Sequence, residues 1–218
     1  MDYQLIDSVA QICIDDGKAN ALNHELIDAM NEALDKAEQE AKAVVILGRE
    51  GMFSAGFDLK ALAKGGQQAA DMLDKGMALV TRMYGFPMPV ISACEGHAIG
   101  MGAFILMASD NRLGANTEYT VNLPETAIGM PFTPVLMSLI KDRIHSAQQT
   151  IAVIQSKKYT PAQAVDAGFL DQLVEQDQLL SSAMELAQEL IKLPAAFYKT
   201  NKLDLRSDKL KIMQDSLK

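Results

Sequence analysis

The chain is poor in several residues on which particular classes of protein depend. It has no tryptophan, three histidines and two cysteines among 218 residues. Two cysteines cannot build the disulfide framework of a small secreted domain, and Cys13 and Cys94 lack the short spacing of a metal site. Both lie in apolar, strand-like runs, so we expect two buried free thiols in a reducing cytoplasm and no bound metal.

Long apolar runs and an excess of positive charge are also absent. No apolar stretch reaches the roughly 20 residues that a membrane helix needs, and residues 1–4 carry neither the basic nor the apolar segment of a signal peptide. The chain has 20 Lys and Arg against 28 Asp and Glu, a net charge of −8. Such a chain is unsuited to the phosphate backbone of nucleic acid. We therefore expect a cytoplasmic protein with no membrane and no nucleic-acid partner.

Apolar residues make up 49% of the chain, which is enough for the core of one sizeable domain. The apolar runs 43–47 and 90–94 predict buried strands, and the alternation over 5–14 predicts further strands. Helical periodicity predicts one helix after Asn23 and another from about residue 67. Strands that alternate with helices favour an α/β fold with a largely parallel sheet.

The remaining segments have weaker signals. An apolar helix is predicted over 102–108, and the chain is mostly helical from Pro131 on. Thr160 and Pro161 form a good helix start, as cap and first helical residue. The stretch Gly65-Gly66-Gln67-Gln68 is predicted to be the most flexible loop. Short strands are predicted at 111–113, 119–121 and 170–175.

Two glycine turns, each after an apolar run, are the most informative pattern in the sequence. The first is residues 53–60, FSAGFDLK, and the second is residues 95–104, EGHAIGMGAF. A strand, a glycine turn and a helix start together present free backbone N–H groups. Two such turns side by side can direct two donors at one oxygen, which is the geometry of an oxyanion hole.

These turns resemble the AGxDL and GxAxGxG segments of the crotonase superfamily, the enoyl-CoA hydratase/isomerase group. A third segment, residues 122–130, NLPETAIGM, resembles the family's PExxxG segment. The order and spacing agree over roughly the whole chain. The resemblance implies a ClpP-like spiral of ββα units over residues 1–160, followed by a C-terminal helical region over 161–218. It also implies an oligomer, a trimer or a dimer of trimers.

The resemblance implies a role for three residues in catalysis. The backbone N–H groups of Phe57 and Met101 would bind the thioester oxygen of an acyl-CoA. Glu125 would act as general acid or base, and its apolar surroundings are expected to raise its pKa. By itself, Glu125 would be taken for a surface residue that caps the helix near Pro131; the family match reverses that interpretation.

Other residues match family positions that contact coenzyme A. Coenzyme A is part of the substrate thioester, so no separate cofactor is expected. Lys60 and Lys18 would contact the phosphates, and the backbone of Ala55 would contact the adenine. The basic tail over 199–211 is either near the nucleotide, as in the family, or a solvated helix face.

One departure from the family pattern bears on the reaction. Family hydratases carry a second glutamate two residues after the last glycine of the second turn, where this chain has Phe104. Phe104 would line the substrate site but cannot activate water, so one carboxylate remains. The family's Δ3,Δ2-enoyl-CoA isomerases also have an apolar residue there, which favours isomerisation of a double bond. A hydratase with a single glutamate and a catalytically silent acyl-CoA-binding protein remain as alternatives.

Two further candidates are weaker. Ser54 precedes the first turn, but it lies in no GxSxG elbow and has no obvious partner base, so a serine hydrolase is disfavoured. His97 follows Gly96 and is more often a turn residue than a catalyst. Six methionines are typical either of an adaptable acyl pocket or of plain core: Met72, Met77, Met83, Met101, Met107 and Met130.

Overall fold

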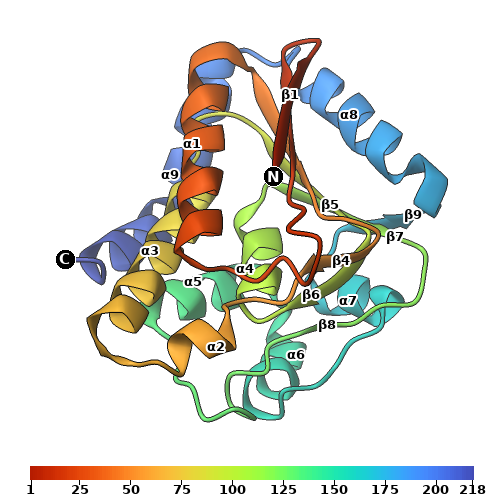
Figure 1. The fold of residues 1–218 in the computed structure, drawn as a ribbon. Coiled ribbons are helices and arrows are strands. Elements are labelled where there is room, and N and C mark those ends of the chain that lie inside the picture. The colour runs from red at the N-terminus through yellow and green to blue at the C-terminus, as the bar shows by residue number, and fades with distance from the viewer.

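The computed structural model describes residues 1–218 and contains two sheets surrounded by helices (Figure 1). The larger sheet has the strand order β1-β2-β3-β5-β7-β9. All neighbours in it are parallel except the first pair, β1 and β2, which confirms the predicted parallel sheet. Its strands are β1 (Asp2–Ile6), β2 (Val9–Cys13), β3 (Ala43–Leu47), β5 (Val90–Cys94), β7 (Asn111–Ala115) and β9 (Gln172–Val174).

A smaller parallel sheet has the order β4-β6-β8. Its strands are β4 (Gly51–Ser54), β6 (Gly96–Ile99) and β8 (Val121–Asn122). The chain passes from β3 to β4, from β5 to β6 and from β7 to β8, so each circuit supplies one strand to each sheet. This alternation is the spiral of ββα units that the resemblance implied.

The sequence reasoning placed β6 and the second half of β4 within glycine turns and did not recognise either as a strand. Both are four residues long and begin with glycine. In β6 the glycine is required by close strand packing, because a Cβ atom on Gly96 would overlap the backbone of Gly51 and Met52, whereas the Cβ position of Gly51 has open space around it. Glycine therefore marks a close approach of two strands here as well as a turn.

Three helices test the predictions of helix starts made from the sequence. In α1 (His24–Glu40) the Asn23 side chain accepts a hydrogen bond from the Leu26 amide at 2.8 Å, as a predicted N-cap should. In α3 (Gly66–Tyr84) the first turn occupies residues 66–68, so the expected flexible loop is mostly helix. The apolar helix α4 (Met101–Ala108) begins one residue before its predicted start.

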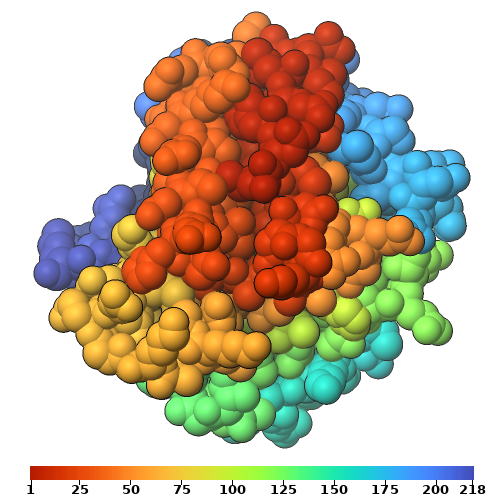
Figure 2. Space-filling model, in the orientation of Figure 1, coloured from red at the N-terminus to blue at the C-terminus, as the bar shows by residue number.

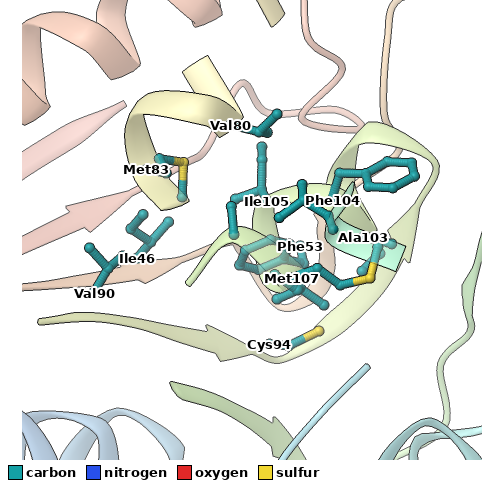
Figure 3. Packing of buried hydrophobic residues seen from close by; sticks show 14 of the residues in the cluster. Ile46, Phe53, Val80, Met83, Val90, Cys94, Ala103, Phe104, Ile105 and Met107 are labelled. Carbon is teal, nitrogen blue, oxygen red and sulfur yellow. The ribbon is translucent and has the colours of Figure 1, made fainter. Parts of the chain in front are cut away.

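The core explains why α4 is so apolar. Every side chain of α4 is buried, and Figure 3 shows Ala103, Phe104, Ile105 and Met107 pointing to different sides of the helix among other core residues. A helix that is apolar all round is one buried on all sides. Cys94 is buried in this core, but Cys13 is only half-buried and donates from its thiol to the Gly48 carbonyl. The expectation of two buried thiols was therefore wrong for Cys13.

Shorter helical segments connect these elements and complete the C-terminal half, which is mostly helical as predicted. At the start of α7, Thr160 and Gln163 form a capping box. No helix of the structure has both the length and the apolarity needed to cross a bilayer. The segments are α2 (Leu59–Leu62), α5 (Pro134–Arg143), α6 (Ser146–Gln149), a π-helical turn (Thr150–Ile154), α7 (Pro161–Ala167), a 3-10 turn (Gln176–Gln178), α8 (Leu179–Leu190) and α9 (Ala195–Asp215).

The basic residues of the tail lie on α9, and three of them anchor this helix to the rest of the fold. Lys202 Nζ lies 2.7 Å and Arg206 Nη1 lies 2.8 Å from the two carboxylate oxygens of Asp110. Lys209 pairs with Asp142 at 2.9 Å. Because Lys202 and Arg206 are buried, this part of the tail is neither a solvated face nor free to bind a nucleotide. The sequence could not show this burial, because it depends on how α9 packs over the Asp110 side chain.

Candidate active site

The three motif segments follow the carboxyl ends of the three strands in the small sheet. The first turn follows Ser54 at the end of β4, the second follows Ile99 at the end of β6, and Glu125 comes shortly after Asn122 at the end of β8. The strands are parallel, so their carboxyl ends meet at one edge. A backbone hydrogen bond of 2.9 Å from the Gly100 amide to the Asn122 carbonyl joins two of the segments there.

The two glycine turns touch through their backbones. Gly56 has φ +83°, and a Cβ atom on it would lie 2.6 Å from the Ile99 carbonyl oxygen and 3.0 Å from the Met101 amide nitrogen. A Cβ atom on Gly102 would overlap the Ser54 carbonyl. Only glycine allows both contacts. The glycines of the two motifs therefore bring the residues after Gly56 and Gly100 to the same place.

Phe57 and Met101 present unsatisfied amides at this place. The Phe57 amide has no protein acceptor, although its neighbours are held by hydrogen bonds from the Leu22 amide to the Gly56 carbonyl, 2.7 Å, and from the Asp58 amide to the Leu22 carbonyl, 2.9 Å. Met101 is the first residue of α4, where an amide has no carbonyl four residues back to bind. The dipole of α4 adds partial positive charge at this end. The site can therefore stabilise a developing oxyanion.

Glu125 lies beside these amides. Its residue is 7% exposed, and its Oε2 atom has no hydrogen-bond partner in the protein. Its Oε1 atom lies 3.2 Å from where a Cβ atom of Gly100 would stand, next to Met101. Burial raises the pKa of Glu125 to about 7, as its apolar surroundings predicted. The alternative of a surface glutamate is wrong, and this carboxyl can exchange protons near neutral pH.

Phe57, Met101 and Glu125 all line one cavity of about 400 Å³. It lies between the segment of α2 and α3 and the segment that follows β8, which meet on one face of the molecule in Figure 2. Three of the six methionines line the cavity, and the other three are core. The lining is Ala55, Gly56, Phe57, Leu59, Leu73, Asp74, Met77, Ile99, Gly100, Met101, Pro124, Glu125, Ile128, Met130, Pro131, Thr133 and Leu136.

Phe104 does not line this cavity. Its side chain is fully buried, and its ring meets the Phe132 ring edge-on with the centroids 6.4 Å apart. Position 104 therefore supplies core packing, and the expectation that this residue lines the substrate site was wrong. The register from Gly100 and Gly102 correctly identified a helical position behind the second turn, but it did not show which way the side chain points.

Ser54 and His97 both have structural partners. The Ser54 hydroxyl donates to the Asn20 carbonyl at 2.8 Å and accepts from the Gly56 amide at 3.2 Å, which holds the first turn. His97 Nδ1 accepts from the Thr120 amide at 3.0 Å, which ties β6 to the chain before β8. Neither residue lines the cavity. No group of three or more His, Cys, Asp or Glu side chains is placed to hold a metal ion.

The residues expected at the coenzyme A end lie around the first turn. Ala55 lines the cavity, and its amide donates to the Ala19 carbonyl at 3.0 Å, which brings the loop containing Lys18 against the turn. Lys18 and Lys60 are exposed and form no ion pair. Arg49, which the sequence reasoning did not single out, donates from Nε to the Lys18 carbonyl at 2.8 Å.

Several lining residues were missed in the sequence. Leu73, Thr133 and Leu136 line the cavity but belong to no motif. Leu73 and Met77 are four residues apart on α3, so a helical stripe could have indicated a shared face. The others come from the irregular segment after Glu125 and from α5, and no local pattern shows that these elements face α3.

Comparison with known proteins agrees with this geometry. The family model of enoyl-CoA hydratase/isomerase matches residues 5–214. Carnitinyl-CoA dehydratase of Salmonella paratyphi A is 32% identical over 187 residues, which cover 84% of this chain and 71% of that protein. The crystal structure of probable enoyl-CoA hydratase EchA3 from Mycobacterium tuberculosis H37Rv has a TM-score of 0.95 and 37% identity, covering 99% of this chain and 92% of that one. A second structure of the same M. tuberculosis protein, described as an apo structure of the enoyl-CoA isomerase, has a TM-score of 0.94 and 37% identity, covering 99% and 95%.

The spiral fold and the cavity at the edge of the small sheet define an enzyme of the crotonase superfamily. Within that superfamily, the chain belongs to the enoyl-CoA hydratase/isomerase family.

Proposed function

We propose that this enzyme moves a carbon–carbon double bond within an enoyl-CoA thioester, from the 3-enoyl to the conjugated 2-enoyl position. The observation that carries this proposal is one buried carboxyl, Glu125, in a mostly apolar cavity beside two free amides. The only other carboxyl of the lining, on Asp74, is exposed on α3. A lone base beside an oxyanion site is suited to moving a proton between two carbons of one substrate.

The proposed reaction has two proton transfers. Glu125 in its carboxylate form removes a proton from C2, and the electrons pass to the thioester oxygen, which the Phe57 and Met101 amides stabilise as an enolate. The enolate then takes the same proton from Glu125 at C4, and the double bond forms between C2 and C3. No atom is gained or lost, and no redox partner takes part.

Hydration is the rival reaction, and the relative described as carnitinyl-CoA dehydratase favours it. The Mycobacterium tuberculosis relative is described as a probable enoyl-CoA hydratase in one structure and as an enoyl-CoA isomerase in the other, so its descriptions favour neither reaction. Family hydratases place a second glutamate where this chain has Phe104, which lies in the core. A hydratase would have to hold water with Glu125 alone. A silent acyl-CoA-binding protein is the remaining alternative.

The rest of the substrate is assigned from the family resemblance. Lys18 and Lys60 would neutralise phosphates of coenzyme A, and the Ala55 backbone would contact the adenine. Both lysines are exposed near the first turn, where a flexible charged molecule can reach them. The assembly would be a trimer or a dimer of trimers, and the two free thiols fit a cytoplasmic location.

The test is to incubate the protein with a 3-enoyl-CoA and, separately, with a 2-enoyl-CoA. Mass spectrometry and ultraviolet absorbance identify the products. Conversion of the 3-enoyl ester into the conjugated ester without a change of mass supports isomerisation. Addition of one water to the 2-enoyl ester would instead show a hydratase. No reaction with either ester, while both still bind, would favour the silent binding protein.

A further inference from the structure

The side chains of Phe57 and Met101 converge on a single glycine of α3. A Cβ atom on Gly76 would lie 2.6 Å from Cε1 of the Phe57 ring, closer still to its Cζ atom, and 3.2 Å from the Met101 methyl carbon. Real Cβ atoms are not found as close to other atoms as this one would be to the two ring carbons, so the ring tip occupies the space that a side chain at position 76 would need. The Phe57 ring therefore packs directly against the backbone of Gly76.

This contact lies at the wall of the cavity. Leu73 and Met77, three residues before and one residue after Gly76 on α3, both line the cavity, as Phe57 itself does. Gly76 shares their face of the helix but is buried and does not line the cavity, because the Phe57 ring covers it. Without the ring, the cavity would continue along α3 over Gly76.

We propose that the Phe57 ring, seated on Gly76, determines how long an acyl chain the cavity accepts. This inference rests on the proposed function and assigns a specificity role to the Phe57 side chain, distinct from the role of its amide. The lining near the ring is apolar, through Leu73, Met77 and Met101, so the ligand portion that meets the ring is an aliphatic chain. The ring blocks that chain from extending along α3.

Two substitutions at this contact should act in opposite directions. Phe57→Ala keeps the backbone amide, removes the ring and uncovers Gly76, so the cavity lengthens. Gly76→Ala adds a methyl group where the ring tip lies. The ring tip is the mobile end of a side chain and can swing away from α3, which pushes it into the cavity and shortens it. Alanine is also a better helix former than glycine, which favours folding of this variant.

The test measures dissociation constants for saturated acyl-CoA thioesters from butyryl to dodecanoyl by isothermal titration calorimetry. These ligands have no double bond to move, so the readout does not depend on the reaction. Phe57→Ala should favour longer chains, by about tenfold in relative affinity for two additional buried methylenes. Gly76→Ala should favour shorter chains. The double variant Gly76→Ala/Phe57→Ala should accept long chains again, because the displaced ring is gone.

Phe197→Ala is the matched control, since this phenylalanine is 69% exposed on α9 and does not line the cavity. It should keep the wild-type order of affinities. If Phe57→Ala and Gly76→Ala both bind acyl-CoA with the wild-type length preference, the inference is wrong and the proposed function still stands. If the wild-type protein binds none of the thioesters, both the inference and the proposed function are wrong.

Discussion

The backbone of Gly56 lies against the amide of Met101, so closely that a Cβ atom on Gly56 would lie 3.0 Å from the Met101 nitrogen. The two residues belong to different turns and follow different strands of the small sheet. Their contact sets the distance between the two free amides of the site. The glycine of the first motif therefore acts on an amide donor of the second.

Gly56→Ala should separate the two turns and weaken the oxyanion site. The new methyl group would collide with the Ile99 carbonyl, and φ +83° is itself strained for alanine. We expect turnover to fall by about 10²–10³-fold, as for loss of one oxyanion donor, with folding destabilised by about 1–3 kcal/mol. Enzyme kinetics and urea unfolding would measure both. Gly51→Ala is the control, because Gly51 has φ +74° with open space around it; equal losses of turnover in the two variants would contradict the explanation.

Glu125→Gln should strongly slow proton transfer while the pocket still binds its ligand. The amide has nearly the same shape as the carboxyl but cannot act as a base. We expect turnover to fall by about 10²–10⁴-fold, with the dissociation constant for a saturated acyl-CoA changed little. Steady-state kinetics and calorimetry separate the two quantities. Full activity in the variant would show that another group moves the proton.

The raised pKa of Glu125 makes both activity and stability depend on pH. The proposed reaction begins with the carboxylate form, so activity should increase with pH around pH 7. Stability should change in the opposite direction. Between the ordinary pKa of 4.5 and the folded value of about 7, the folded protein holds a proton that the unfolded chain has released. Raising the pH through this window therefore removes stability, on the order of 3 kcal/mol in total.

Glu125→Gln provides the control for this pH dependence, because glutamine does not titrate. The free energy of unfolding of the variant, minus that of the wild type, should increase between pH 5 and pH 9. Urea unfolding at several pH values measures this difference. A difference that stays constant over the range would mean that the pKa of Glu125 is not raised.

Asp110→Ala should loosen α9 from the rest of the fold. Asp110 binds both Lys202 and Arg206, and all three side chains are at most 8% exposed. Removing the carboxylate leaves two buried cations without their partner, which typically costs about 3–5 kcal/mol. Urea unfolding measures the loss. Asp215→Ala, which removes an exposed pair with Lys218, should change stability by less than about 1 kcal/mol; a similarly small effect at Asp110 would contradict this account.

Lys60→Gln should weaken binding of the coenzyme A portion. The substitution removes one positive charge from an exposed residue near the first turn. The Michaelis constant should increase several-fold at low salt, with the turnover number little changed, and the difference should shrink as salt screens the charge. Kinetics at two salt concentrations measure this. Lys36→Gln, on α1 beside Glu40, is the control. An equal effect there would show that binding depends on the net charge of the protein and not on the position of Lys60.

The sequence by itself predicted the strands and helices with strong patterns. The apolar runs at 43–47 and 90–94, the Asn23 cap and the Thr160 start all appear in the structure where they were expected. These signals are local, since burial of a whole strand or satisfaction of a helix end depends on a few neighbouring residues. The glycine motifs also indicated the family, which the comparisons confirm.

Only the tertiary structure decided the features that depend on contacts between distant segments. It placed β4, β6 and β8 in one sheet, so that the Phe57 and Met101 amides and Glu125 meet at its edge. It turned Phe104 into the core and buried the tail cations against Asp110. The direction of a side chain and the partner of a charge depend on which elements pack together. No stretch of sequence carries that information alone, because packing is decided by the whole chain.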